Sequence, residues 1–161
     1  MARILVTGMS GVGKSTLLAE LHQRGHRTVD TDFDGYTHEV RKGDRIVDHV
    51  WDSALMDSLL ATAGDEHLFV SGCVSNQGTW YPQFDAVALV SVPRDTLLER
   101  IATRRTNAFG QNGEDLKAIL DDLQHVEPVL RETATVELDG QRSVDDLVCE
   151  LEALAEASPH R

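Results

Sequence analysis

Hydrophobic and polar positions form short blocks along the chain, and the spacing within each block predicts strands and helices in turn. Short runs rich in β-branched and apolar side chains predict buried strands at residues 2–7, 28–29, 68–70, 86–92 and 133–138. Apolar positions at intervals of three and four predict helices at residues 15–24, 46–63, 93–104, 116–123 and 143–154. Pro128 should kink or restart the chain after the fourth of these helices. The more polar stretches between these elements predict loops at residues 30–35, 41–44, 71–82 and 106–113.

Strands that alternate with helices at this pitch predict an α/β fold. Such a fold has a parallel sheet, here of five strands, with helices on both faces. The chain has 161 residues and shows no internal repeat, so we expect a single domain over residues 1–161. Its hydrophobic content of 41% is sufficient for a core.

The charge balance narrows the classes of partner. The chain carries 15 Lys and Arg residues against 27 Asp and Glu residues, a formal net charge of -12, which argues against binding to nucleic acid or to an anionic membrane surface. The longest strongly apolar run, residues 86–92, is far shorter than the roughly 20 residues of a membrane span. Because Gly8 interrupts the first apolar run too early for a secretory signal, we expect a cytoplasmic protein. Cys73 and Cys149 lack a metal or redox spacing, so we expect them to be buried as small hydrophobic residues.

A glycine-rich motif between the first predicted strand and the first predicted helix carries the strongest chemical signal. It fits Gly-x-x-x-x-Gly-Lys-Ser with the residues Gly8, Met9, Ser10, Gly11, Val12, Gly13, Lys14 and Ser15, and Thr16 then enters the helix. Glycines let successive backbone N–H groups face a phosphate, and the helix N-terminus adds partial positive charge. The motif predicts ATP binding, with Lys14 bridging the β- and γ-phosphates and the Ser15 hydroxyl acting as a Mg²⁺ ligand. A dinucleotide fingerprint is excluded because Thr16 stands where its third glycine would be.

With this motif near its start, Asp30-Thr31-Asp32 after the second predicted strand and arginines before a polar loop, the chain resembles the small P-loop kinases. Shikimate, gluconate and adenylate kinases are members, and the whole chain also resembles the small ATP-binding proteins labelled AAA family ATPase. The resemblance implies a five-stranded parallel sheet, an acceptor-binding segment at about residues 35–64 that is helical over residues 44–63, and a short lid at about residues 103–113.

The same resemblance implies roles for individual residues. Asp30 would serve the Mg²⁺ shell, and Asp32 would orient the acceptor hydroxyl, which agrees with the need of phosphoryl transfer for a carboxylate and for oxygen ligands. Arg100 would contact the nucleotide, and Arg104 and Arg105 would act as lid arginines on the transferring phosphoryl group. Two plainer interpretations stay open, that the acids are solvated loop residues and that the arginines are ordinary cations at a helix end.

Departures from the family pattern bear on the acceptor. The third predicted strand ends in Ser71-Gly72-Cys73, without an acidic residue for the metal, and no Lys or Arg lies between Arg45 and Arg94. Anionic acceptors usually require arginines, whereas the acids of this region favour a neutral or cationic hydroxyl compound. These acids are Asp48, Asp52 and Asp57. Four residues could line the acceptor pocket or belong to the core: His49, Trp51, Trp80 and Tyr81.

The sequence therefore predicts an ATP- and Mg²⁺-dependent kinase of a small hydroxyl compound, present as a monomer or weak homodimer. One alternative is a nucleoside or nucleotide kinase similar to adenylate kinase. An alternative of another class is an ATP-binding switch, or a resistance-type binding module with weak ATPase activity.

Overall fold

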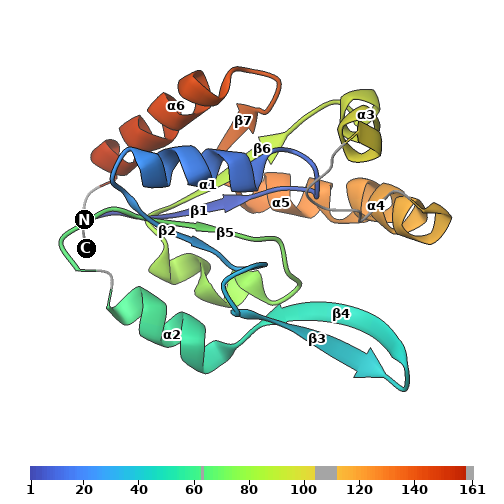
Figure 1. Ribbon diagram of the computed structural model, residues 1–161. Coiled ribbons are helices and arrows are strands. Elements are labelled where there is room, and N and C mark those ends of the chain that lie inside the picture. Colours follow the sequence, from blue (N-terminus) through green and yellow to red (C-terminus); the bar gives the residue numbers. More distant parts are fainter. Residues whose placement is uncertain (63, 104–111, 159–161) are drawn as a thin grey trace.

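The computed structural model describes residues 1–62, 64–103 and 112–158 (Figure 1). Within these ranges, five parallel strands form the central sheet in the order β2-β5-β1-β6-β7. The predicted α/β fold with a five-stranded parallel sheet is confirmed. The sheet strands are β1 (Arg3–Thr7), β2 (Arg27–Asp30), β5 (Leu68–Ser71), β6 (Ala86–Ser91) and β7 (Val136–Asp139).

Helices cover both faces of this sheet. Side chains alternate between the faces along each strand, so apolar strands require a helical cover on each side. On β1, Ile4 and Val6 pack into a core with α1 and α6, whereas Leu5 packs on the opposite face with α2 and the 3-10 helix η1. Figure 1 shows α1 and α6 together on one side of the sheet and α2 on the other. The helices are α1 (Lys14–Gln23), α2 (Ser53–Ala61), η1 (Gln77–Gln83), α3 (Arg94–Thr103), α4 (Gly113–His125), α5 (Glu127–Thr133) and α6 (Val144–Ala157).

The largest departure from the sequence analysis is an antiparallel hairpin in the acceptor-binding segment. Strands β3 (Thr37–Lys42) and β4 (Arg45–Trp51) form it, so the helix predicted at residues 46–63 is wrong over its first part. Ile46 and Val50 are four residues apart, which imitates a helical face, but a glycine at φ +64 turns the chain at position 43. The hairpin projects from the body of the molecule (Figure 1).

The helix α2 begins only after the hairpin, at a conventional N-cap. The Asp52 carboxylate accepts a hydrogen bond from the backbone N–H of Leu55 at 2.9 Å, which satisfies a free donor of the first turn. The predicted capping box before α6 is confirmed in part, because the Ser143 hydroxyl accepts from the N–H of Asp146 at 3.1 Å.

Several element boundaries also differ from the prediction. Pro128 lies in the first turn of α5, which confirms that the chain restarts there, and α5 extends to Thr133, so β7 begins three residues later than predicted. Residues 71–82, predicted as a loop, contain the start of η1. Most of the loop predicted at residues 106–113 lies outside the described residues, and position 113 begins α4.

The two cysteines differ in their surroundings. Cys73 is partly buried and packs against the core, as predicted, but Cys149 is exposed on α6, so its predicted burial is wrong. Its sulfur instead accepts a weak hydrogen bond from Arg24 at 3.6 Å. Among the helices that the structure describes, none combines the length and the apolar character that a membrane crossing requires.

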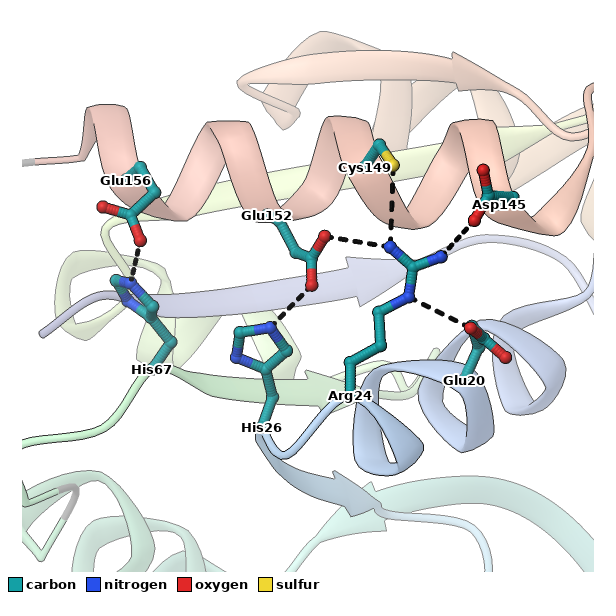
Figure 2. A network of polar contacts seen from close by, with 8 residues as sticks. All are labelled: Glu20, Arg24, His26, His67, Asp145, Cys149, Glu152 and Glu156. Carbon is teal, nitrogen blue, oxygen red and sulfur yellow. Dashed lines mark hydrogen bonds and ion pairs between the residues drawn. The ribbon is translucent and has the colours of Figure 1, made fainter.

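A network of charged side chains ties α6 to the end of α1 and to the beginnings of β2 and β5 (Figure 2). Arg24 contacts three carboxylates, those of Glu20, Asp145 and Glu152. Two histidines add polar contacts to the same helix, His26 with Glu152 at 2.8 Å and His67 with Glu156 at 3.2 Å. The network lies toward the amino ends of the strands. The glycine-rich loop of residues 8–13, called the phosphate loop below, lies at their carboxyl ends.

Candidate active site

The glycine-rich loop connects β1 to α1 and lies against β6 and α3. At Gly8, φ is +150, and a Cβ atom would lie 2.4 Å from the carbonyl oxygen of Val90, so only glycine fits. A Cβ atom on Gly11 would lie 2.9 Å from Cγ1 of Ile101. Gly13, at φ +104, is the N-cap of α1. The loop thus follows neighbouring elements closely, and its path requires the glycines that the motif predicts.

Two buried apolar side chains anchor this loop to the core. Met9 and Val12 are buried at 4% and 2% exposure within the core that contains α1 and α3. Because they fix the loop by packing, the backbone between β1 and α1 is left to face a ligand.

The Lys14 ammonium group bends back over the loop. Its Nζ donates hydrogen bonds to the carbonyl oxygens of Gly8 at 2.6 Å and Met9 at 3.0 Å. The positive charge is therefore held above the phosphate loop by the loop itself.

The structure brings Ser15 and Asp30 together. The Ser15 hydroxyl donates to Oδ2 of Asp30 at 2.7 Å, which joins the start of α1 to the end of β2. A hydroxyl and a carboxylate are hard oxygen ligands of the kind that Mg²⁺ accepts beside phosphate oxygens and water. The described residues contain no cluster of three His, Cys, Asp or Glu side chains suited to a metal ion. The pair therefore fits an ion that completes its shell from a nucleotide, and does not form an all-protein metal cage.

Asp32 lies two residues beyond the end of β2. A turn presents it: the N–H of Asp32 donates to Oδ1 of Asp30 at 3.2 Å, and the N–H of Asp30 donates to Asp34 at 2.9 Å. The Asp32 side chain keeps contact with solvent, but desolvation of its carboxyl group raises its pKa. The charge of Lys14 opposes this rise in pKa, Asp30 adds to it, and His49 of the hairpin opposes it. Asp32 thus lies within electrostatic range of the phosphate loop and of the hairpin.

Cys73, at the carboxyl end of β5, also borders this site. Burial raises the pKa of its thiol, while the positive charge of Lys14 and a hydrogen bond with Thr7 lower it. The smaller electrostatic contributions to the same pKa come from Asp122 and Asp32, which raise it. The end of β5 therefore presents a neutral thiol, and no acidic side chain that could bind a metal ion follows this strand in Gly72-Cys73.

The loop after β5 was predicted from the sequence, but its buried residue Gln77 was not among the candidate site residues. The Gln77 side chain is buried, and its amide donates to the hydroxyl groups of Thr7 at 3.1 Å and Tyr81 at 2.9 Å. Its oxygen accepts from the N–H of Val74 at 2.9 Å. Thr7 immediately precedes the phosphate loop, so Gln77 supports that loop from inside the protein. Two consecutive amide side chains, Asn76 and Gln77, in the loop predicted after this strand were the signal available in the sequence.

The predicted arginines divide between described and undescribed residues. Arg100 donates to the carbonyl oxygens of Val12 at 3.2 Å and Gly140 at 2.9 Å, so it links the phosphate loop to the loop after β7. Arg104 and Arg105, and most of the predicted lid, lie outside the described residues.

Three acids of the acceptor-binding segment have structural partners. Their presence is therefore weaker evidence for a neutral or cationic acceptor. The Asp48 carboxylate accepts from the Ser75 hydroxyl at 2.6 Å, and Asp52 caps α2 and pairs with His38. Asp57 accepts from the indole of Trp80 at 2.8 Å. These three carboxylates contribute negative charge, but their positions are explained by folding.

Two of the four residues considered for an acceptor pocket belong to the core. Trp51 and Trp80 are 1% and 2% exposed and pack edge to face, with ring centroids 5.8 Å apart, so they belong to the core. Tyr81 is partly buried, and His49 is exposed on the hairpin.

Comparison with models of known families matches residues 4–121 to the AAA domain family. The chain belongs to the AAA domain family. None of the curated proteins matches this AAA domain chain in sequence.

Solved structures with a similar fold include kinases of small molecules, in agreement with the resemblance described above. A shikimate kinase from Acinetobacter baumannii in complex with shikimate is similar with a TM-score of 0.61 and 15% identity, over 100% of this chain and 96% of that chain. A sugar kinase from a Janibacter species is similar with a TM-score of 0.60 and 17% identity, over 99% and 96% of the two chains. A gluconokinase from Sinorhizobium meliloti has a TM-score of 0.55 and 19% identity, over 98% and 93%. At these identities the similarity shows the fold.

Proposed function

We propose that this AAA domain protein is an ATP- and Mg²⁺-dependent kinase that transfers the γ-phosphate to a hydroxyl group of a small neutral or cationic molecule. The observation that carries the proposal is the hydrogen bond of 2.7 Å between Ser15 and Asp30. It joins the phosphate loop to the acidic turn, residues 30–32. The groups proposed to bind the nucleotide and to activate the acceptor hydroxyl thus lie at the same edge of the sheet, where the parallel strands have their carboxyl ends.

The residues of the loop have distinct roles in this proposal. The backbone of residues 8–13 and Lys14 bind the β- and γ-phosphates, and Ser15 and Asp30 hold Mg²⁺. The metal ion supplies charge neutralisation for the phosphate oxygens when it is bound.

Asp32 is the group that orients the acceptor hydroxyl and receives its proton. Desolvation raises its pKa, so its carboxylate is a better proton acceptor than an ordinary aspartate. Arg100 steadies the phosphate loop from its contact with Val12, and we assign charge stabilisation during transfer to Arg104 and Arg105.

The choice of acceptor class rests on charge. The stretch between Arg45 and Arg94 contains no Lys or Arg, and it covers most of the hairpin strand β4, all of α2 and the loop after β5. A phosphate or carboxylate placed beside Asp32 would find no fixed cation on that side of the site. Structures of the same fold include a shikimate kinase, a sugar kinase and a gluconokinase, which supports a small hydroxylated acceptor.

The experiment that tests the proposal incubates the protein with γ-labelled ATP, Mg²⁺ and a metabolite extract, and then identifies the small molecules that gain label. Asp32→Asn should abolish the labelling while Mg·ATP binding stays within about threefold of wild type. The control is Asp44→Asn, which removes an acid from the turn of the hairpin and should keep full labelling.

Two outcomes would contradict the proposal. Hydrolysis of ATP with no labelled acceptor in any extract would favour an ATP-binding switch, and label found mainly on nucleotides would favour a nucleotide kinase.

A further inference from the structure

The acidic turn, residues 30–32, contains a residue whose side chain faces into the protein. Thr31 stands between Asp30 and Asp32 and is 0% exposed. Its N–H and its hydroxyl both donate to the carbonyl oxygen of Ser71, at 3.0 Å and 2.8 Å. The turn is therefore fixed to the end of β5 from its middle residue.

The two ends of the hairpin meet at the same threonine. Thr37, the first residue of β3, donates its hydroxyl to the carbonyl oxygen of Thr31 at 2.8 Å. Trp51, the last residue of β4, donates its indole N–H to the hydroxyl oxygen of Thr31 at 2.9 Å. Thr31 thus holds both roots of the hairpin at once, although they are 14 positions apart in the sequence.

This junction leaves no free space and is itself held in place. A Cβ atom on Gly72 would lie 2.3 Å from the hydroxyl oxygen of Thr31 and 2.9 Å from the indole ring of Trp51. The Asn76 side chain accepts from the N–H of Trp51 at 2.9 Å and donates to its carbonyl oxygen at 3.1 Å. A buried network in which every polar group has a partner has one preferred arrangement.

We propose that Thr31 is a positioning residue that couples the hairpin of residues 37–51 to the carboxylates of Asp30 and Asp32. The hairpin and the acidic turn then move as one unit, and contact between an acceptor and the hairpin sets the position of Asp32. The effect of this coupling on turnover rests on the proposed function. The structural link between the hairpin and the acidic turn does not depend on phosphoryl transfer.

Two variants break the hydrogen bond between Thr31 and the end of β4, and one matched control does not. Thr31→Val keeps the shape of the side chain but removes the hydroxyl, and Trp51→Phe removes the indole N–H. The control is Trp80→Phe: Trp80 is equally buried in the same core, and its indole also donates one hydrogen bond, but to Asp57 of α2. Trp51→Phe and Trp80→Phe each lose one indole hydrogen bond, so a general loss of stability affects these two variants alike, whereas Thr31→Val loses two hydrogen bonds.

The split between kinetic constants tests the effect on turnover. Thr31→Val and Trp51→Phe should lower kcat about tenfold, with affinity for Mg·ATP within about threefold of wild type, because the phosphate loop is held separately. Trp80→Phe should lower the melting temperature but keep kcat within about twofold. Equal kcat values in Trp51→Phe and Trp80→Phe would overturn the proposal.

A spectroscopic measurement tests the coupling without turnover. The chain has 2 Trp residues, so a proton–nitrogen NMR spectrum contains one indole signal from each, assigned by Trp51→Phe and Trp80→Phe. Adding Mg²⁺ with a non-hydrolysable ATP analogue should shift the Trp51 signal more than the Trp80 signal, and Thr31→Val should suppress this shift.

The two measurements distinguish an error in the proposed function from an error in the proposed coupling. If the wild-type protein phosphorylates no acceptor but the Trp51 signal responds to the analogue through Thr31, the proposed function is wrong and the coupling stands. If the analogue binds and the Trp51 signal does not respond, or responds equally in Thr31→Val, the coupling is wrong.

Discussion

Replacing Lys14 by alanine separates a role in the fold, which the structure shows, from the proposed role in nucleotide binding. Nζ donates to the carbonyl oxygens of Gly8 at 2.6 Å and Met9 at 3.0 Å. Hydrogen bonds from a charged donor contribute about 1.5 kcal/mol each or less where water competes. Lys14 is also the first residue of α1, where a cation opposes the helix dipole by about 0.5 kcal/mol. Lys14→Ala should therefore lower the free energy of unfolding by about 1 kcal/mol, which is a fall of about 3 °C in melting temperature.

The effect on nucleotide binding should be larger. When ATP binds, the ammonium group exchanges two carbonyl partners for phosphate oxygens, so its net contribution to affinity is smaller than that of an entirely new ion pair. We expect Lys14→Ala to weaken Mg·ATP binding about 100-fold, equivalent to about 2.7 kcal/mol.

Titration calorimetry with Mg·ATP and thermal melting of the same samples measure the two effects. The matched control is Lys42→Ala, which removes an exposed lysine from the end of β3 and should change neither quantity. A folded Lys14→Ala protein that binds Mg·ATP within about threefold of wild type would refute the phosphate-loop assignment.

Three further predictions concern the loop, its neighbouring thiol and a distant ion pair. Gly8→Ala should lower the free energy of unfolding by about 2–3 kcal/mol, because its Cβ would lie 2.4 Å from the carbonyl oxygen of Val90; denaturant melting that matched wild type would contradict this packing. Cys73 should react slowly with a thiol reagent, because burial raises its pKa, and Mg·ATP should slow it further; mass spectrometry distinguishes it from the chain's exposed cysteine, and a rate unaffected by nucleotide would place Cys73 outside the site. Hydrogen bonds from Arg131 hold the pKa of Glu137 below its ordinary value of 4.5, so the pair stabilises the protein above that pH and loses its effect as the pH falls through the lower folded pKa. Glu137→Gln should therefore cost about 0.5 kcal/mol at pH 7 and less in acid, and urea melts that differ equally at both pH values would exclude this linkage.

The sequence was informative where the backbone has few choices. The glycine spacing of the loop was recognisable because the backbone requires glycine at two of its positions: Gly8 lies close to β6, and Gly13 has a positive φ. The proximity of Asp30 to Ser15 was also accessible, because parallel strands bring their carboxyl ends to one edge of the sheet.

The hairpin was not predicted, because its apolar positions satisfy two periods at once. Ile46 and Val50 fit a helix by spacing, and the β-branched character of residues 46, 47 and 50 together with Gly43 was the evidence for strands. Tertiary contacts also reassigned acids and aromatics: Asp57 is explained by its bond to Trp80, a partner 23 positions away that no local pattern indicates. For the same reason, the contact of Arg100 with Gly140 follows only from the fold.

The central claim is that the site phosphorylates a hydroxyl group of a neutral or cationic molecule. The most direct test is kcat/KM for γ-phosphate transfer to a defined panel of neutral polyols, amino alcohols, nucleoside monophosphates and shikimate. Each anionic group held near Asp32 should meet repulsion of about 1.4 kcal/mol or more, so the best neutral or cationic acceptor should exceed every anionic one by about tenfold. Efficient transfer to a nucleoside monophosphate, lost in Arg41→Ala or Arg45→Ala, would contradict the claim.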